Sequence, residues 1–266
     1  MNQLYFLHIP KTAGKFISGS IEKSIPNALN SLYISTYFPN NKEFLKDKIY
    51  ISAHAGMYIP NTIDNIDVVT IVRNPLEARA SYFNFIYHMY LDERKEYINL
   101  KTMRDKFLYY LFEDKNFLIH NNYQSRFLCN GSDPRSWDRK SFFEDSHSML
   151  KKYYEGQGFD WFIDNEKTSL DTAINNISKF KIKNTVENID SFTKKITEWF
   201  LENHKIHIEF DKGSKINESL SNYNGESYSS LDLIKMLTEE EILKVIDLNS
   251  IDYAVYNFVK DLENQN

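Results

Sequence analysis

The stretch from Leu4 to Ile25 does most to limit the folds open to this chain. It reads LYFLHIPKTAGKFISGSIEKSI: a short apolar run, a turn with Pro, Lys, Thr and Gly, and a segment of helical periodicity. The apolar run predicts a strand over Leu4–His8, and the periodicity predicts a helix over Lys15–Lys23. A strand that leads through a short turn into a helix is the repeating unit of parallel α/β sheets.

The turn Pro10–Gly14 has the composition of an anion-binding loop. Successive backbone N–H groups and the positive end of the helix dipole favour an anion at such a helix N-terminus. Lys11 adds a mobile positive charge, Thr12 adds a hydroxyl donor, and Gly14 allows close approach of the backbone. The nucleotide loop G-x-x-x-x-G-K-[ST] is not matched, because the first glycine is missing and the lysine precedes the glycine. An ordinary strand-to-helix turn is the alternative.

A second strand carries another candidate anion site. The β-branched run Asp67–Arg73 suits the middle of a buried parallel sheet, and Pro75 suits the first turn of a following helix. Arg73 offers a planar fork to phosphate oxygens, and Ser81 adds a hydroxyl in the second turn of that helix. Ligands of parallel sheets lie beyond the carboxyl ends of the strands. We therefore predict two anion sites at adjacent strand ends, which a ligand with phosphates at both ends of a ribose would fit.

The other patterns predict helices that alternate with short strands. Further strands are expected over Ile49–Ser52 and Ile182–Val186. Helices are expected over Leu76–Leu91, over Ile189–Asn203 and from Glu239 after the N-cap Thr238, and Leu100–Glu155 is expected to be mostly helical. Loops are expected at Gly131–Pro134 and Lys212–Ser230. Early strands that alternate with helices indicate a parallel sheet covered on both faces. We predict an α/β, P-loop-like, three-layer fold with a central, mostly parallel sheet, helical insertions and a single domain over residues 1–266.

Composition and charge exclude several classes of protein. The chain has 266 residues, of which 42% are hydrophobic, so a sizeable core is possible. Its formal charge of −5 and scattered lysines argue against a nucleic-acid partner, which needs an extended positive groove. No apolar run approaches the roughly 20 residues of a membrane span and no signal-peptide pattern is seen, so we expect a cytoplasmic protein without membrane insertion. The single cysteine, Cys129, excludes a disulfide framework.

Two segments carry a resemblance to a known family. HIPKTAG at His8–Gly14 and RNPLEARASYF at Arg73–Phe83 resemble the sulfotransferases that use 3′-phosphoadenosine 5′-phosphosulfate, in the branch with the carbohydrate 2-O-sulfotransferases and many bacterial relatives. The resemblance implies a 3′-phosphate site at Arg73 and Ser81. It implies a 5′-phosphosulfate site formed by Pro10, Lys11, Thr12, Ala13, Gly14, Lys15 and Phe16. The last two stand where the family usually has hydroxyl residues.

The resemblance continues more weakly along the chain. NYQSRFL is similar to the family's N-x-Q-[ST]-R-x-L stretch and makes Gln124 and Arg126 candidate contacts to the acceptor or cofactor, with an exposed salt bridge as the alternative. A late N-x-S segment resembles a loop near the cofactor and implies contacts from Asn217 and Ser219. The terminal DYAVY, which begins at Asp252, is similar to the family's D-x-x-L-Y.

His54 is the candidate general base. It follows a predicted strand and lies at the same sheet edge as the loop. The family has a similar [GA]-H-x-x-[FY] turn, and a histidine there serves as base in the carbohydrate enzymes that this chain resembles. A histidine with an unperturbed pKa of about 6.5 can accept a proton at neutral pH. A hydrogen-bonded structural histidine is the alternative, and we expect that structural role for His8, with its ring bonded to nearby backbone.

These observations predict an enzyme that transfers a sulfuryl group. The cofactor is 3′-phosphoadenosine 5′-phosphosulfate, and the acceptor is a hydroxyl or amine of a small molecule, neutral or cationic, such as a specialised metabolite. Lys11 is expected to neutralise the leaving phosphate, and the chemistry requires no metal. A bacterial saccharide or lipid-linked sugar is the alternative acceptor. The rival classes are a kinase-like nucleotide hydrolase and a nucleotide-binding module of the same fold without catalysis.

Overall fold

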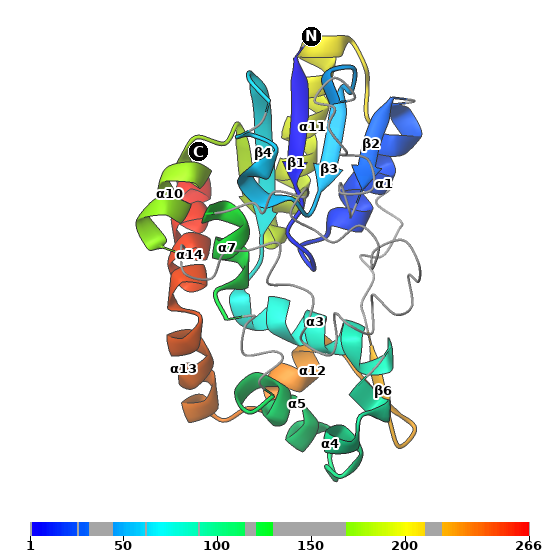
Figure 1. The fold of residues 1–266 in the computed structure, drawn as a ribbon, viewed down its shortest axis with the longest axis vertical. Helices are drawn as coiled ribbons and strands as arrows, with labels where there is room; N and C mark the ends of the chain where they lie inside the picture. The colour runs from blue at the N-terminus through cyan, green and yellow to red at the C-terminus, as the bar shows by residue number, and fades with distance from the viewer. Residues whose placement is uncertain are drawn as a thin grey trace, which may run out of the picture.

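A five-stranded parallel sheet forms the centre of the computed structural model, which describes residues 2–25, 27–31, 45–61, 63–89, 91–114, 121–129, 169–210 and 220–265. The strand order is β2-β3-β1-β4-β5, and all four neighbouring pairs are parallel (Figure 1). The strands are β1 (Gln3–Leu7), β2 (Ala28–Ser31), β3 (Tyr50–Ala53), β4 (Ile66–Val72) and β5 (Ile182–Thr185). The predicted α/β class and parallel sheet are confirmed, whereas β2 was not predicted.

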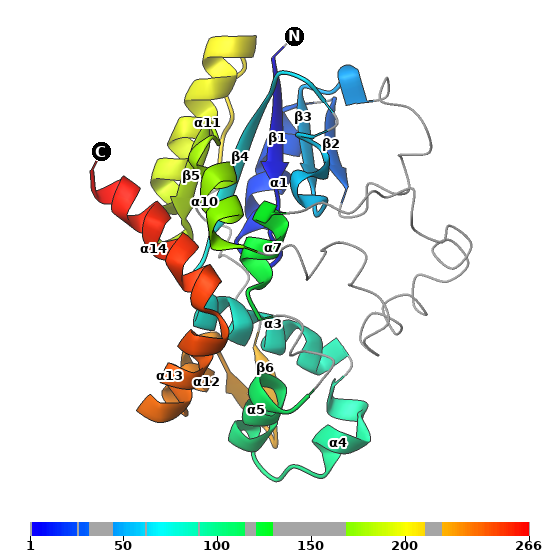
Figure 2. The same cartoon turned by 60° about the vertical axis from the view of Figure 1, so that its left-hand side comes forward.

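Helices cover both faces of the sheet. The first face is packed by α1 (Gly14–Ser24) and α11 (Ile189–His204), and the second by α7 (Tyr123–Cys129), α10 (Leu170–Ser178) and α14 (Ser250–Asn264) (Figures 1 and 2). In the central strand β1, Leu4 and Phe6 pack in the core on the first face, and Tyr5 and Leu7 pack in the core on the second face. Successive side chains of a strand point to opposite faces, so an uninterrupted apolar run is required where both faces are covered.

A further group of elements lies beyond the carboxyl ends of the strands. It forms an aromatic-rich core of its own, in which the ring of Phe83 lies 5.1 Å from Phe107 and 5.2 Å from Tyr110. Its elements are α3 (Pro75–Met89), α4 (Lys95–Ile98), α5 (Met103–Phe112), α12 (Ser230–Lys235), α13 (Glu239–Leu248), β6 (Ser221–Tyr223) and β7 (Glu226–Tyr228). Short 3₁₀ turns occur at Gly56–Tyr58, Leu91–Glu93 and Val186–Asn188. Figure 2 shows this group below the sheet, with α3 directly beneath the strand ends.

The expectation of a loop over Lys212–Ser230 is wrong in its described part. Strands β6 and β7 pair as an antiparallel hairpin. Asn224 and Gly225 form its turn with φ values of 51° and 81°. Asn-Gly between two strands is a strong hairpin signal, because both turn residues must adopt positive φ. Asn217 and Ser219 lie outside the described residues, as does the loop expected at 131–134. The capping box at Thr238 is confirmed.

Helices α7 and α14 cap each other's N-termini. The Asn122 side-chain oxygen accepts hydrogen bonds from the backbone N–H groups of Ile251 and Asp252, at 3.0 and 3.2 Å. In return, the Asp252 carboxylate accepts from the backbone N–H groups of Gln124 and Ser125, at 3.0 and 2.7 Å. These bonds satisfy N–H groups that a helix leaves unpaired at its start. They fix α7 beside the strand ends.

Candidate functional site

The predicted site residues meet where β1, β3 and β4 end. Strand β1 pairs with β3 on one side and with β4 on the other, so the loop after β1 lies between His54 and Arg73. One Nη1–H of Arg73 points to the carbonyl oxygen of Lys11 at 3.4 Å. The prediction that the loop, His54 and Arg73 share one edge of the sheet is therefore confirmed.

Two left-handed residues give the loop its shape. Lys11 has φ 68° and Ala13 has φ 64°, although neither is glycine. For residues with a Cβ atom this conformation costs about 1–2 kcal/mol each. Ala13 directly precedes α1, and among the described residues no side chain caps the start of this helix. The uncapped N-terminus and the turned backbone are the features with which proteins bind anions.

Thr12 acts inside the loop. Its side chain is fully buried, and its hydroxyl donates to the carbonyl oxygen of Ile9 at 2.7 Å. A threonine hydroxyl has one proton, so this bond occupies the donor that we assigned to an anion. In this conformation Thr12 stabilises the turn, and its backbone N–H is the group with which it could contact a ligand.

Gly14 makes room for a histidine ring. A Cβ atom at this position would lie 1.7 Å from Nε2 of His8. The His8 ring stacks on Phe6, with 5.3 Å between centroids and 9° between planes. Its Nδ1 is buried and has no hydrogen-bond partner in the described part of the chain, so the bond that we expected from the ring to nearby backbone is not found at this nitrogen. The close approach inferred for Gly14 is present, with His8 as the neighbour.

His54 is held in one tautomer. Its Nδ1 lies 2.6 Å from the carbonyl oxygen of His8. A carbonyl only accepts, so Nδ1 carries the proton and Nε2 keeps the lone pair that a general base needs. Burial lowers the pKa of His54 to about 4, so the ring is neutral at physiological pH. The bond from Nδ1 to the His8 carbonyl is the kind expected of a structural histidine, and it also leaves Nε2 as the nitrogen that could accept a proton.

Positive charge gathers around the loop. Lys11 places its ammonium 4.5 Å from the centre of the Phe85 ring. Burial, together with the charges of Lys15 and Arg73, lowers the pKa of Lys11 to about 8. A lysine pKa falls in this way where solvent is excluded and nearby cations add repulsion. A bound anion would reverse that effect and favour the ammonium.

Arg73 follows β4 and is positioned by contacts with Glu77 of α3 and with Gln124 of α7. Its Nε donates to the Glu77 carboxylate at 3.2 Å. Its backbone N–H donates to Oε1 of Gln124 at 2.9 Å, and its carbonyl accepts from Nε2 of the same amide at 2.8 Å. Gln124 therefore fixes the end of β4, and its contact with an acceptor stays a prediction. Arg126, on the same helix, is half-buried and lies within electrostatic reach of Asp252.

Ser81 lies on the part of α3 that faces the loop. It is buried, and it precedes Phe85 by four residues on the same helix. Residues four apart lie on one face of a helix, and Phe85 contacts Lys11. Ser81 is therefore on the loop side of α3. Its contact with a phosphate stays a prediction.

The described residues contain no group of three His, Cys, Asp or Glu side chains that could hold a metal ion. Within the same residues no helix is both long and apolar enough to span a membrane. No family model and no curated sequence matches the chain. A functional assignment therefore depends on the site itself.

Proposed function

We propose that the edge formed by β1, β3 and β4 binds a nucleotide that carries two separate phosphate groups. The observation that carries this proposal is the loop at Lys11–Ala13, which leads into the uncapped N-terminus of α1 and contacts Arg73 through the Lys11 carbonyl. The loop offers backbone N–H groups and one ammonium, and Arg73 offers a second cationic group on the neighbouring strand. Two phosphates on one ribose match two such groups.

Within that class, we propose a P-loop-like sulfotransferase that uses 3′-phosphoadenosine 5′-phosphosulfate. The anion loop follows the central strand β1, and the strand beside it ends in Arg73. His54 supports transfer to an acceptor over simple binding, because it follows the strand next to β1 and its Nδ1–H bond to the His8 carbonyl leaves the lone pair on Nε2. The residues fit the cofactor, since Lys11, Lys15 and Arg73 would offset its charges.

The cofactor, when bound, supplies an activated sulfuryl group. Lys11 and the N-terminus of α1 would hold its 5′ side and neutralise charge on the leaving phosphate, while Arg73 and Ser81 would hold its 3′-phosphate. His54 would take the proton of the acceptor hydroxyl or amine on Nε2. The His8 carbonyl keeps the proton on Nδ1 throughout. Bound negative charge nearby raises the pKa of His54 and makes it a stronger base.

Calorimetry with adenosine 3′,5′-bisphosphate, ADP and magnesium ATP tests the proposal. We expect the bisphosphate to bind at least about 10-fold more tightly than ADP, because the Arg73 guanidinium would donate hydrogen bonds to the 3′-phosphate, which ADP lacks. Arg73→Ala should abolish this preference. Arg104→Ala is the control, since Arg104 pairs with Glu241 away from the loop. Equal binding of the three nucleotides, or preference for ATP, would contradict the proposal and favour a kinase-like hydrolase.

His54→Ala separates an enzyme from a binding module. In an enzyme, loss of the base should lower turnover by about 10²- to 10⁴-fold and leave bisphosphate affinity unchanged. A module without catalysis shows bisphosphate binding in both proteins and turnover in neither. The acceptors to be screened are small molecules with a hydroxyl or amine, and bacterial saccharides as the second class.

A further inference from the structure

The candidate base His54 lies on a short turn that follows β3, so its position depends on what holds that turn. The imidazole is half-buried and contacts the His8 ring, with 4.3 Å between the ring centroids. Its Nδ1 bonds to the His8 carbonyl. A general base must stay within about 0.5 Å of its working position. One bond at the ring fixes the tautomer, but the backbone of the turn needs a support of its own.

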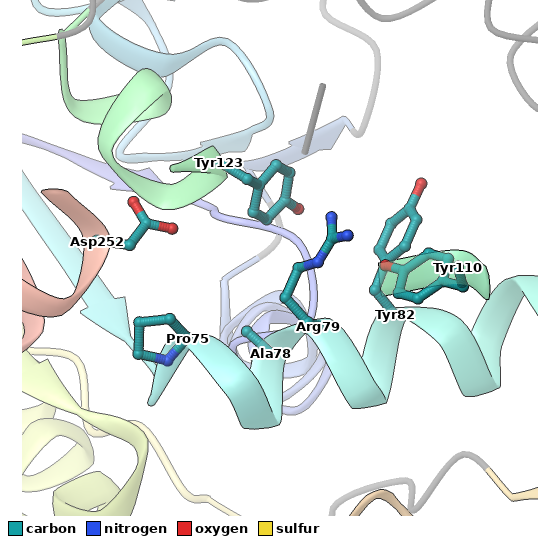
Figure 3. A pocket seen from close by; sticks show the side chains of 7 residues that line it. All are labelled: Pro75, Ala78, Arg79, Tyr82, Tyr110, Tyr123 and Asp252. Atoms are coloured by element: carbon teal, nitrogen blue, oxygen red, sulfur yellow. The ribbon is translucent and has the colours of Figure 1, made fainter. Parts of the chain in front are cut away.

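Helix α7 supports one side of the His54 ring. Phe127 of α7 meets this ring edge-on, with 6.3 Å between the centroids. Figure 3 shows where α7 meets α3: Tyr123 of α7 lies near Arg79 and Tyr82 of α3, with 6.2 Å between the two tyrosine rings. The space left among these side chains is about 10 Å³, which is room for roughly one water molecule. This junction is therefore a packed wall of the site, with no room for a ligand among the described residues.

Tyr5 of β1 reaches the turn that carries His54. Its ring is fully buried in the core on the second face of the sheet. Its hydroxyl lies 3.0 Å from the carbonyl oxygen of Gly56 and 3.4 Å from that of Ala53. A carbonyl only accepts, so the hydroxyl donates its single proton, mainly to the nearer oxygen. These two carbonyls lie directly before His54 and two residues after it, so the hydroxyl spans the turn.

The backbone of the turn leaves the regular sheet at this point. Strand β3 ends at Ala53, whose carbonyl accepts from the His8 N–H at 3.1 Å. Gly56 then has a φ of 50°, in the left-handed region, and begins a 3₁₀ turn. The Gly56 carbonyl thus lies beyond the strand pairing. The bond from Tyr5 ties it back to the central strand.

The hydroxyl is the one group of Tyr5 that a phenylalanine would lack. A phenylalanine ring would fill the same space in the apolar core. Burial of a hydroxyl costs free energy unless the group is hydrogen-bonded, so packing alone does not favour tyrosine here. Burial also raises the pKa of Tyr5, so the hydroxyl keeps its proton and remains a donor. The hydroxyl therefore has its effect through the turn that it contacts.

We propose that Tyr5 is a positioning residue for His54. Its hydroxyl fixes the turn Ala53–Gly56, and the turn places the His54 ring against the His8 carbonyl. Tyr5 is fully buried and acts on the reaction only through His54. The role of His54 as a base rests on the proposed sulfotransferase function, whereas the positioning of its ring does not.

Tyr5→Phe tests the proposal on the His54 ring itself. Long-range proton–nitrogen NMR spectra of the nitrogen-labelled protein report the tautomer and the pKa of each histidine, and His54→Ala identifies the signals of His54. The unmodified protein should show the Nδ1–H tautomer and a pKa of about 4. In Tyr5→Phe the Nε2–H tautomer should appear, and the pKa should rise by at least about one pH unit, because a loosened turn lets water reach the ring.

Tyr50→Phe is the matched control. Tyr50 is also fully buried, and it lies on β3, the strand that leads to His54. Its hydroxyl shares a hydrogen bond with the Ser18 hydroxyl at 3.0 Å and does not contact the turn. Loss of this hydroxyl removes a buried hydrogen bond from the same strand. It should leave the tautomer and the pKa of His54 unchanged.

Kinetics separate positioning from a general loss of stability. A displaced base should lower the turnover of Tyr5→Phe by about 10- to 100-fold. The affinity for adenosine 3′,5′-bisphosphate should stay unchanged, because the contacts of the anion loop do not involve the Tyr5 hydroxyl. General destabilisation would instead lower both quantities. Tyr50→Phe should leave both unchanged.

Gly56→Ala covers the case in which Tyr5→Phe does not fold. A residue with a Cβ atom is strained at a φ of 50°, so the carbonyl that Tyr5 holds should move and the pKa of His54 should rise in the same way. The proposal would be overturned by the Nε2–H tautomer in the unmodified protein, by an unchanged His54 in the variant that folds, or by equal changes in Tyr50→Phe. Failure to bind the bisphosphate would overturn the sulfotransferase function, while the NMR spectra still test the positioning.

Discussion

Side chains of the loop Pro10–Gly14 have roles inside the protein that their sequence motif does not reveal. Gly14 accommodates the His8 ring, and Thr12 closes the turn onto Ile9. The backbone of His8 fixes the tautomer of His54. The loop is thus held in shape by residues that the sequence marks as ligand contacts. Substitutions there change the conformation of the loop as well as its affinity for an anion.

Gly14→Ala should lower the free energy of unfolding by about 1–3 kcal/mol, because the new methyl group meets the His8 ring. In a His8→Ala background the same substitution should cost less than about 0.5 kcal/mol, since its neighbour has gone. Urea unfolding of the four proteins measures this coupling. Gly19→Ala in the same helix is the control: nothing lies within 4 Å of its added Cβ, and it should stabilise by about 0.5–1 kcal/mol. Additive effects of the His8 and Gly14 substitutions would show that the ring has room to move.

Bisphosphate binding should weaken as the pH rises above about 8. The pKa of Lys11 in the free protein is lowered to about 8, chiefly by burial. A bound anion raises this pKa, so binding takes up a proton once free Lys11 is neutral. Affinity should then fall by up to 10-fold per pH unit, until the pKa of the complex is reached. Calorimetry between pH 7 and pH 10 measures the slope.

Lys11→Arg is the matched control for this pH dependence. Its guanidinium stays charged over the whole range, so its affinity should be nearly constant between pH 8 and pH 10. The same slope in both proteins would mean that another group takes up the proton. His54 does not titrate in this range, since its pKa is lowered to about 4.

At the scale of elements, α7 and α14 depend on each other. The start of each helix is capped by a side chain of the other: Asn122 caps α14, and Asp252 caps α7. Helix α7 in turn presents Gln124 to the backbone of Arg73. A disturbance of the capping pair should therefore reach the proposed 3′-phosphate site. The DYAVY and NYQSRFL segments meet here, and their contact is structural.

Asp252→Ala should lower the free energy of unfolding by about 2–3 kcal/mol, because it leaves buried N–H groups of α7 without an acceptor. It should also weaken bisphosphate binding through Gln124 and Arg73. Asp261→Ala is the control on the same helix: Asp261 is exposed, and its loss should change stability by less than about 0.5 kcal/mol. Chemical denaturation and calorimetry give the two quantities. If Asp252→Ala matched Asp261→Ala in both, the mutual capping would have little energetic weight.

In the molecule as a whole, the site depends on the order of the strands in the sheet. The chain carries a net charge of −5, yet Lys11, Lys15 and Arg73 meet at one edge. They do so because β1 lies between β3 and β4, and because the helices beyond the strand ends pack against that edge. A net charge of −5 describes the chain as a whole, not a local site of this size.

Much of the sheet could be predicted from local patterns. Strands β1 and β4 are apolar on both faces, and α1 and α11 have one apolar face, so each shows its periodicity in the sequence. Strand β2 escaped prediction because ALNS is short and half polar, and within the described part of the chain it pairs with β3 alone. The hairpin at Asn224-Gly225 was signalled by its turn residues, but the polar composition of its strands hid it.

Local sequence patterns were enough to predict the α/β class, the loop Pro10–Gly14 between a strand and a helix, and the cationic residue at the end of β4. These features follow from periodicity and turn chemistry, which act over a few residues. The tautomer of His54, the space that Gly14 leaves for the His8 ring and the stacking of Arg79 on Tyr110 depend on the tertiary structure. The bond between His54 and His8 spans 46 positions, and the bond between Gln124 and Asp252 spans 128. Such contacts depend on how distant elements pack, and no local pattern encodes that packing.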